Sequence, residues 1–326
     1  MKKVILAYNR VSPEVITQLK EDYEVIYFEK NEYLDDPFFV QTLKKASGVI
    51  GLDLKVTKEL LDLAPELKII SNVSVGYDNL PVDELSQRGI MATNTPDVLT
   101  DTTADAIFGL LLAAARRIAE LDHYVKSEQW NELLPPHLFG MDVHHKKLGI
   151  IGMGRIGQAI AKRGHFGFDM EILYHNRSRK LEAENWLNAS YVSMDELLAE
   201  SDFVCLMVPA SPETKQLISH EEFKKMKQTA IFINGSRGQN VDEDALYHAL
   251  ENGTIWAAGT DVFTEEPLPA GHKLLTCKNL VTLPHIGSST AETEHKMSVV
   301  AANNLQAGLS GKLPPNLINK EVKLNR

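Results

Sequence analysis

The 326-residue sequence contains only two cysteines, Cys205 and Cys277, and neither belongs to a C-x-x-C or histidine-rich motif. This scarcity excludes a disulfide scaffold and a cysteine-based metal site, and we expect two inert thiols in a reducing cytoplasm. No apolar run approaches the roughly 20 residues that a membrane-spanning helix needs. The sequence therefore predicts a cytoplasmic protein that has no membrane partner and binds no metal.

Basic residues are also fewer than acidic ones: the sequence has 34 lysines and arginines and 44 acidic residues, which gives a net charge of −10. Nucleic acids and acidic membranes are bound by a concentrated basic face, so this balance argues against both partners. The amino-terminal MKKVILAYNR has too short an apolar stretch for a signal peptide and lacks a small-residue cleavage site. We expect a first β-strand there. The length of the chain suits two domains.

Short β-rich runs alternate with helical segments along the first hundred residues. The expected strands cover residues 3–8, 24–28, 48–52, 67–73 and 90–93. Between them, residues 12–14, 36–37 and 57–59 each place a capping residue or an early proline before a helical stretch. Strands and helices that alternate in this way predict a parallel sheet covered by helices.

A long helix is expected next, from about Thr102 to residue 125. The segment is rich in alanine and leucine, lacks proline, and places Asp105 three residues after a possible Thr102 cap. Its apolar surface is wider than one face, which predicts burial on two sides. An interdomain or subunit contact would explain that width.

A second alternating series begins at Lys147. Its expected strands cover residues 148–151, 170–175, 203–208, 230–234, 257–262 and 280–283. A last helix is expected from about residue 291 to residue 309, and we expect it to return to the first module. The pattern predicts an α/β fold with two doubly wound parallel sheets in one chain.

The segment GIIGMGRIG places Gly152, Gly154 and Gly157 directly after an apolar strand and at the start of a helix. In this context the G-x-G-x-x-G pattern is informative. The first glycine permits a tight turn, the second lets the backbone approach a pyrophosphate, and the third lets the helix lie close to the strand. The unpaired N–H groups of the helix start then stabilise the phosphates. The motif predicts dinucleotide binding, against the alternative of an ordinary tight turn.

The next strand runs into Asn176, Arg177, Ser178 and Arg179. NAD enzymes of this type usually carry an acidic residue here, which binds the ribose 2′-hydroxyl. This chain has instead two guanidinium groups and a hydroxyl, which suit the oxygens of a 2′-phosphate. We therefore expect NADPH to be preferred, with NAD possible; a solvated basic turn is the alternative interpretation.

Six motifs, in this order, resemble those of the D-isomer-specific 2-hydroxyacid dehydrogenases. They are NVSVGYDNLPVDELSQRGI, TNTPDVLTDTTADAIFGLLLAAARR, LGIIGMGRIGQAIAKR, FINGSRGQNVDEDAL, AAGTDVFTEEPLP and NLVTLPHIGSST. The likeness covers nearly the whole chain. Within the family, the chain is most similar to bacterial glyoxylate/hydroxypyruvate reductases and 2-ketogluconate reductases (gluconate 2-dehydrogenases).

The resemblance implies an architecture and a reaction. A Rossmann NAD(P)-binding domain, residues 99–289, would be inserted into a flavodoxin-like substrate domain formed by residues 1–98 and 290–326. The family is commonly dimeric through the inserted domain, so we expect a homodimer formed through the helix that follows Thr102. The implied activity is the NADPH-dependent reduction of small 2-keto acids to D-2-hydroxy acids.

The resemblance assigns the chemistry to Arg237, Glu266 and His285. A planar guanidinium at Arg237 can hold the carboxylate of a 2-keto acid and polarise its carbonyl. An imidazole such as His285 can protonate the carbonyl oxygen near neutral pH. Glu266 is expected to bond the other ring nitrogen and to raise the pKa of the imidazole. Glu265 is the competing candidate, but the position directly before Pro267 matches the family pattern better.

The resemblance also implies roles for further positions. The substrate would be bound by Leu52, Val75, Gly76 and Ser288, together with Arg237. The cofactor would be contacted by Thr103, Arg155, Ile156, Pro209 and Asp261, together with the three glycines and residues 176–179. Asp261 has an alternative role as a loop cap.

Other members of the same scaffold stay open as alternatives. Formate dehydrogenases carry Gln in place of the Glu of the His–Glu pair, which Glu266 argues against. Phosphite dehydrogenases keep all three residues and are not separated by motif. A dinucleotide-sensing transcription partner is a more distant alternative, since such proteins carry extra recognition segments and disordered tails. Among 2-keto acids, the motifs do not distinguish glyoxylate, hydroxypyruvate and 2-ketogluconate.

Overall fold

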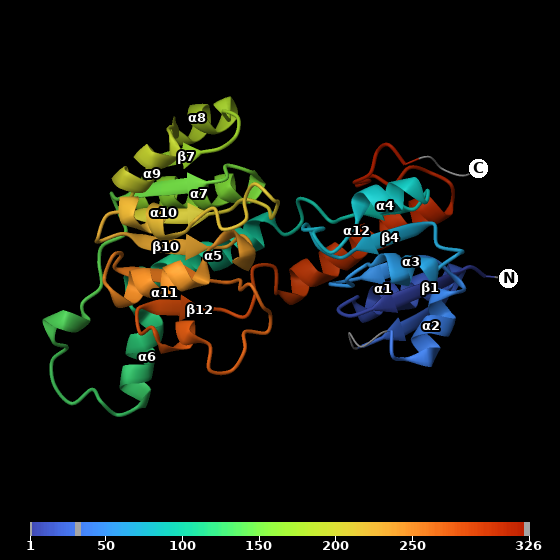
Figure 1. Cartoon of the computed structure of the whole chain (residues 1–326), viewed down its shortest axis with the longest axis horizontal. Coiled ribbons are helices and arrows are strands. Elements are labelled where there is room, and N and C mark those ends of the chain that lie inside the picture. The colour runs from blue at the N-terminus through green and yellow to red at the C-terminus, as the bar shows by residue number, and fades with distance from the viewer. Residues whose placement is uncertain (1, 30–33, 323–326) are drawn as a thin grey trace. The chain divides into compact units, whose positions relative to one another are not determined.

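The computed structural model describes residues 2–29 and 34–322 (Figure 1). The chain divides into two compact units. The first unit combines Met1–Leu99 with Ser288–Arg326, and the second unit is Thr100–Gly287. No helix among the described residues has the length and apolar character to cross a membrane. Each unit contains one parallel sheet with helices, as the alternating pattern predicts.

The first unit contains a five-stranded parallel sheet in the order β2-β1-β3-β4-β5. The strands are β1 (Val4–Tyr8), β2 (Glu24–Phe28), β3 (Ala46–Gly51), β4 (Ile69–Asn72) and β5 (Met91–Thr93). The helices are α1 (Pro13–Asp22), α2 (Pro37–Leu43), α3 (Lys58–Asp62), α4 (Val82–Gln87) and α12 (Ala291–Leu309). This strand order is that of the flavodoxin-like fold, in which the order reverses between β1 and β3.

The last helix of the chain, α12, packs on β3 and β4 of the first unit. Two glycines permit the close approach. A Cβ atom added to Gly48 would lie 2.7 Å from Cδ1 of Leu305, and one added to Gly308 would lie 2.6 Å from Cδ1 of Ile69. The carboxyl-terminal helix thereby completes the core of a sheet whose strands all come from the first hundred residues.

The second unit contains a seven-stranded parallel sheet in the order β12-β11-β10-β9-β6-β7-β8. The strands are β6 (Lys147–Ile151), β7 (Glu171–His175), β8 (Ser190–Tyr191), β9 (Phe203–Leu206), β10 (Ile231–Asn234), β11 (Ala257–Thr260) and β12 (Leu280–Thr282). The order is that of the Rossmann fold with one strand added beyond the sixth. The two-residue strand β8 was not predicted, because its two exposed residues are too few to form a recognisable pattern.

Helices lie on both faces of this second sheet. They are α5 (Thr100–Ala115), α6 (Ile118–Lys126), α7 (Arg155–Phe168), α8 (Leu181–Leu187), α9 (Met194–Glu200), α10 (His220–Lys225) and α11 (Glu243–Glu251), with 3₁₀ turns η1 (Pro136–Leu138), η2 (Gly238–Asn240) and η3 (Lys273–Thr276). Alternate residues of β9 enter different cores: Phe203 and Cys205 face the core beneath α5 and α7, whereas Val204 and Leu206 face the core beneath α9 and α11. Strands buried on both faces explain the continuous apolar runs of the sequence.

The prediction of one long helix after Thr102 was wrong in detail. The structure has α5, which begins at Thr100, and a separate α6 that begins at Ile118, with Arg117 between them at a left-handed φ of 53°. The Ala115 carbonyl accepts a hydrogen bond from the backbone N–H of Met141, which closes the loop after α6 over the end of α5. A tertiary contact of this kind leaves no pattern in the local sequence.

The width of the apolar surface of α5 has an explanation within the second unit. One side of α5 packs on the sheet, where Ile107 lies against Gly235 and Leu110 lies against Gly259. On the other side, the ring of Phe108 lies 5.0 Å from that of Phe168 at the end of α7. Contacts within the second unit therefore account for burial of α5 on two sides, and the expected subunit or interdomain contact stays a prediction. Exposed apolar side chains are found instead on α6 and the loop after it: Ile118, Val125, Trp130, Leu133 and Phe139.

Candidate active site

Two loops at the carboxyl edge of the second sheet bring a histidine and a glutamate together. His285 follows β12, and Glu266 lies in the loop that follows β11. The Nδ1 atom of His285 lies 2.7 Å from Oε2 of Glu266. Oε1 of the same carboxylate accepts a hydrogen bond of 2.8 Å from the backbone N–H of Phe263. Because a carboxylate can only accept, Nδ1 carries the proton of this bond, and Nε2 is the ring nitrogen left for exchange.

The pair alters the pKa of both partners. The hydrogen bond that His285 donates to Glu266 is the main cause that raises the pKa of His285 above its ordinary value, against the opposing effect of burial. Burial alone would raise the pKa of Glu266, but hydrogen bonds from His285 and Phe263, together with the charge of His285, hold it below its ordinary value. The imidazolium–carboxylate form is therefore favoured over a broad pH range.

Asp261 fixes the backbone directly after His285. This carboxylate is 2% exposed, and burial raises its pKa. Its two oxygens accept hydrogen bonds of 2.7 Å and 2.9 Å from the backbone N–H groups of Ile286 and Gly287. His285 itself has a left-handed φ of 53°, a conformation uncommon for histidine. The loop-cap interpretation of Asp261 thus has direct support in the geometry, and the expected cofactor contact stays a prediction.

Thr103, on the first turn of α5, lies beside the turn that Asp261 holds. A Cβ atom added to Gly287 would lie 3.2 Å from both Cγ2 of Thr103 and Oδ2 of Asp261. The structure therefore brings Thr103 and Asp261 together beside the turn that carries His285. Both residues were expected to contact the cofactor, and they share one location in the second unit.

Arg237 follows β10 and is half-buried. Its loop is held by a polar network that the sequence analysis did not identify. The side-chain amide of Asn234 donates to the carbonyl of Arg237 at 3.2 Å, and the amide of Asn240 donates to the carbonyl of Val208 and to the hydroxyl of Ser236. Polar residues at the end of the buried strand IFIN and directly after it are the sequence feature that could have indicated this network. The positive charge of Arg237 contributes to the lowered pKa of Glu266 and partly opposes the rise in the pKa of His285.

Gly238 brings the Arg237 loop against the Glu266 loop. A Cβ atom at this position would lie 1.9 Å from the carbonyl carbon of Phe263 and 2.1 Å from the nitrogen of Thr264. No side chain fits such a separation, so the two backbones touch here only because the residue is glycine. The contact places the guanidinium loop and the carboxylate loop side by side.

The glycine-rich turn lies between β6 and α7, where the strand order of the second sheet reverses between β6 and β9. Gly152 has a φ of 102°, and a Cβ atom at Gly157 would lie 2.3 Å from the carbonyl oxygen of Gly152. A Cβ atom at Gly154 would meet nothing within 4 Å, so the backbone there is open to a ligand. This geometry fits the pyrophosphate of a dinucleotide at the start of α7. Arg155 and Ile156 form the first turn of α7, and the exposed Pro209 follows β9.

The residues of the basic turn after β7 differ in their contacts. Arg177 and Ser178 are exposed, and the charge of Arg177 contributes to lowering the pKa of Glu213. Arg179 donates from Nε and Nη2 to the two oxygens of Glu184, at 2.9 Å and 2.5 Å, and its guanidinium lies 5.9 Å from the ring centre of Tyr191. The side-chain amide of Asn176 bonds the carbonyl of Ser178 at 2.9 Å.

The remaining substrate candidates lie in the first unit. Leu52 follows β3, and its carbonyl accepts a hydrogen bond of 3.3 Å from the amide of Asn9. The carbonyls of Val75 and Gly76 accept hydrogen bonds from Asn94 at 2.8 Å and from Asn72 at 2.9 Å, which fixes the orientation of these peptides. Ser288, half-buried, precedes α12.

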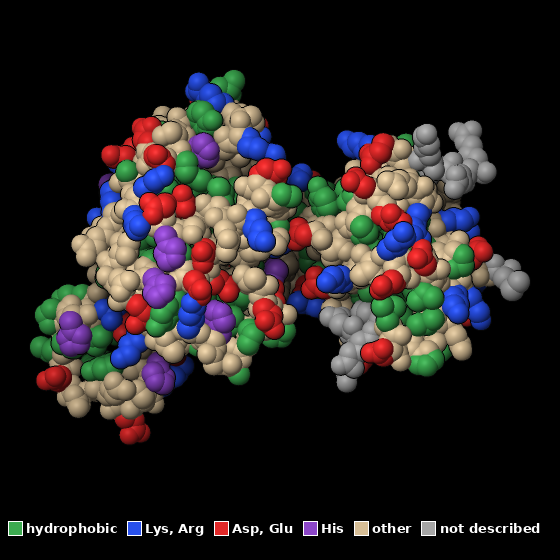
Figure 2. Space-filling view, viewed as in Figure 1, with side chains coloured by type: hydrophobic (Ala, Val, Ile, Leu, Met, Phe, Trp, Pro, Cys, Tyr) green, Lys and Arg blue, Asp and Glu red, His purple; other side chains and the backbone are tan. Residues whose placement is uncertain are grey.

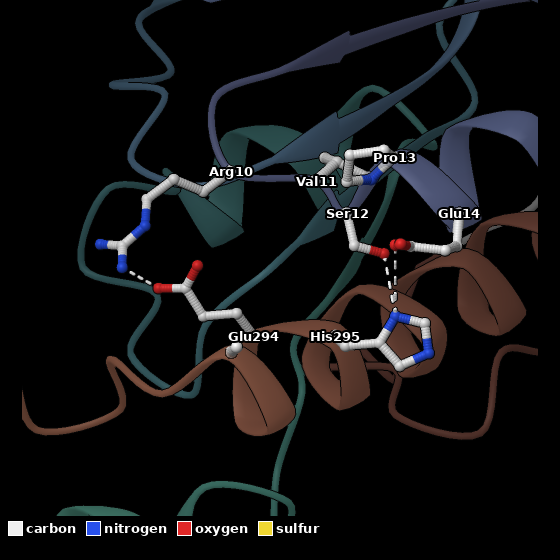
Figure 3. Close-up of a pocket in the computed structure, with 8 residues that line it drawn as sticks. Arg10, Val11, Ser12, Pro13, Glu14, Glu294 and His295 are labelled. Atoms are coloured by element: carbon white, nitrogen blue, oxygen red, sulfur yellow. Dashed lines mark hydrogen bonds and ion pairs between the residues drawn. The ribbon is translucent and has the colours of Figure 1, made fainter.

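A hollow of about 560 Å³ also lies in the first unit, between the loop after β1 and the start of α12 (Figure 3). Arg10 pairs there with Glu294. Nδ1 of His295 lies 3.1 Å from the hydroxyl of Ser12 and 3.8 Å from the carboxylate of Glu14. A nucleophilic triad uses both nitrogens of its histidine, whereas here one nitrogen faces both partners. These contacts therefore tie α1 to α12 and form no nucleophilic centre.

Comparisons with known proteins agree with this geometry. The family described as "D-isomer specific 2-hydroxyacid dehydrogenase, NAD binding domain" matches residues 108–287. The chain is 46% identical over 322 residues to glyoxylate/hydroxypyruvate reductase B of Pectobacterium atrosepticum, with 99% of each chain covered. A 45% identical relative from Yersinia pestis carries the same name and is covered to the same extent.

Solved structures show the same architecture. The NADPH-dependent glyoxylate/hydroxypyruvate reductase of Sinorhizobium meliloti, in complex with NADP and malonate, superposes with a TM-score of 0.88 at 31% identity, covering 100% of this chain and 99% of the other. A protein of Thermus thermophilus superposes with a TM-score of 0.89 at 39% identity, covering 97% and 99%. The chain belongs to the D-isomer specific 2-hydroxyacid dehydrogenase family and is an oxidoreductase of that family.

Proposed function

We propose that the protein reduces small 2-keto acids to D-2-hydroxy acids with NADPH, with glyoxylate and hydroxypyruvate as the first candidates. The observation that carries the proposal is the contact between His285 and Glu266, with Arg237 acting on both electrostatically. The relatives named glyoxylate/hydroxypyruvate reductase B, which match the whole chain, support this choice among 2-keto acids.

The residues have complementary tasks in this proposal. The guanidinium of Arg237 binds the carboxylate of the keto acid and polarises its carbonyl. The imidazolium of His285 donates the proton on Nε2 to the carbonyl oxygen, while its Nδ1–H stays bonded to Glu266. Asp261 holds the backbone after His285 and so keeps the ring in place. The bound reduced nicotinamide supplies the hydride that the carbonyl carbon receives.

We propose that the second unit binds the cofactor. The open backbone at Gly154 and the start of α7 suit the pyrophosphate. Arg177, Ser178 and Arg179 take the place of the acidic residue expected for NAD, which supports a preference for NADPH. In the first unit, the oriented peptides of Val75 and Gly76 suit the substrate carboxylate.

We further propose a homodimer formed through α6 and the loop that follows it. Leu133 is 93% exposed and Trp130 is 64% exposed, an unusual state for large apolar side chains. Figure 2 shows apolar side chains gathered around η1, in the same segment. The Leu133→Glu variant should shift the mass measured by light scattering from dimer toward monomer, whereas a monomeric wild type would contradict the proposal.

The buried, unpaired thiols of Cys205 and Cys277 suit a cytoplasmic enzyme.

A substrate panel tests the reaction directly. Glyoxylate, hydroxypyruvate, 2-ketogluconate and phosphite should each be assayed with both cofactors, in the direction of reduction for the acids and of oxidation for phosphite. The highest kcat/KM is expected for glyoxylate or hydroxypyruvate with NADPH. A highest value for 2-ketogluconate would change the substrate but keep the chemistry, and turnover of phosphite alone would overturn the proposal.

A further inference from the structure

Glu243, the first residue of α11, has a side chain that bonds a neighbouring loop. Its Oε1 atom accepts a hydrogen bond of 2.7 Å from the backbone N–H of Thr264. Its Oε2 atom lies 3.5 Å from Nε2 of His272, and the side chain is 17% exposed. The start of α11 is capped by Asp242, whose side chain accepts from the N–H groups of two following residues. The carboxylate of Glu243 is thus available to the loop that follows β11.

That loop carries Glu266. The N–H of Thr264 bonds Glu243, and the N–H of Phe263, one residue earlier, bonds Oε1 of Glu266. The two consecutive N–H groups therefore link one carboxylate on α11 to the carboxylate that faces His285. His272 lies at the far end of the same loop, directly before η3, so Glu243 contacts the loop at both ends.

The Phe263–Thr264 peptide also lies against Gly238. The peptide is therefore fixed both by a backbone contact and by a charge-assisted hydrogen bond. A hydrogen bond to a charged acceptor is stronger than a neutral one, and here it acts on a backbone group that a shift of the loop would displace. Without it, the Phe263–Thr264 peptide keeps the contact with Gly238 but loses its bond to α11.

We propose that Glu243 is a positioning residue for the reduction: it holds the loop so that the carboxylate of Glu266 meets Nδ1 of His285. The inference rests on the proposed function, because it acts through the His285–Glu266 pair. It adds to that function a residue that touches neither substrate nor cofactor. Loss of the bond to Thr264 lets Glu266 move, and His285 then loses the partner that favours its protonated form.

Charged groups lie at both ends of the chain of contacts that runs from Glu243 to His285. Glu243 faces His272. His285 faces Glu266 and is influenced by Arg237 and Asp261. Asp244, the next residue of α11, is 70% exposed and pairs with Lys273. It provides a control on the same helical turn, because within the described part of the chain it forms no hydrogen bond or ion pair with the Glu266 loop.

The test compares Glu243→Ala, Glu243→Gln and Asp244→Ala. Two readouts are measured: the pKa of His285 by NMR titration of its ring, and the pH–rate profile of keto-acid reduction. Glu243→Ala should lower the pKa of His285, move the alkaline limb of the profile to lower pH, and reduce kcat by about 10- to 100-fold through misplacement. Glu243→Gln keeps an oxygen acceptor for the N–H of Thr264 and should retain most of the wild-type behaviour. Asp244→Ala should match the wild type.

Other outcomes overturn the inference. In a folded Glu243→Ala protein, an unchanged His285 pKa with an unchanged alkaline limb would show that Glu243 only stabilises the fold. Equal defects in Glu243→Ala and Glu243→Gln would show that the negative charge matters rather than the hydrogen bond to Thr264. Failure of the proposed function can be distinguished from failure of this inference. Even if the wild type reduces none of the acids, NMR titration still reports the pKa of His285 in each variant.

Discussion

The Nδ1 atom of His285 and the Oε2 atom of Glu266 lie 2.7 Å apart, and each residue stabilises the charged form of the other. The pKa of His285 is raised and that of Glu266 is lowered. Reduction of a keto acid by general acid catalysis requires the imidazolium, so activity should persist to a higher pH than an isolated histidine allows. This relationship makes the pH dependence of the enzyme a direct report on the pair.

The Glu266→Gln variant tests the charge of the pair. Glutamine keeps the shape and an acceptor but removes the negative charge, so the folded-state pKa of His285 should fall toward its ordinary value. His285 then loses its proton earlier as the pH rises, and the alkaline limb of the reduction profile should move to lower pH. The measurement is a pH–rate profile at saturating NADPH. An unmoved or higher limb would contradict the role of Glu266 and make Glu265→Gln the next variant to test.

Replacement of His285 by alanine removes the proposed acid. The kcat of reduction should fall by at least about 100-fold, which is the usual scale for the loss of a general acid. Binding of NADPH, measured by fluorescence titration, should stay within a few-fold of the wild type, because the phosphates are bound at the start of α7. A comparable loss of cofactor affinity would show that His285 supports the fold of the site rather than proton transfer.

Arg237→Ala should behave differently from His285→Ala. One guanidinium serves both the capture of the substrate carboxylate and the polarisation of the carbonyl, so KM should rise and kcat should fall together. Arg237→Lys keeps the charge without the planar fork and should recover only part of the loss. Steady-state kinetics with glyoxylate measure both parameters. A change in kcat alone would argue that Arg237 does not hold the substrate.

Cofactor preference depends on the basic turn after β7. The double replacement of Arg177 and Arg179 by alanine should erase the preference for NADPH and leave turnover with NADH largely intact. Arg177→Ala alone should account for the larger part, because the Nε–Nη2 edge of Arg179 is already engaged by Glu184. The measurement is the ratio of kcat/KM for the two cofactors. Equal efficiencies in the wild type would remove the basis of the prediction.

The sequence predicts much of the fold because its signals are local and periodic. Buried parallel strands appear as apolar runs, and a capping residue or an early proline marks the starts of α1, α2 and α3. The break between α5 and α6 escapes prediction because it depends on Met141, which returns to the carbonyl of Ala115 from a distant part of the chain.

The candidate site is predictable to a different extent. Motifs identify Arg237, Glu266 and His285, and the structure brings the last two into contact. Gly238 and Glu243 lie within the motif FINGSRGQNVDEDAL, but the motif does not reveal their roles, because both act through contacts with the Phe263–Thr264 peptide. Such contacts follow from how two loops meet, which the chain order does not reveal.

Gly238 offers the last test, because the space around it is the smallest in the site. An alanine there would place its Cβ atom 1.9 Å from the carbonyl carbon of Phe263, so one of the two backbones must move. We expect the Gly238→Ala variant to lose about 1–3 kcal/mol of stability through this overlap. Its kcat should also fall, because the loops that carry Arg237 and Glu266 separate.

Gly109 provides the matched control for that substitution. It lies within α5, and a Cβ atom there would meet nothing within 4 Å. Gly109→Ala should therefore raise the stability by about 0.5–1 kcal/mol, because glycine in a helix interior costs more conformational entropy than alanine. Urea unfolding, followed by circular dichroism, measures both variants. If Gly238→Ala kept wild-type stability and kcat, the contact between the two loops would not position the site, and the argument that links Gly238, Thr264 and Glu266 would fail with it.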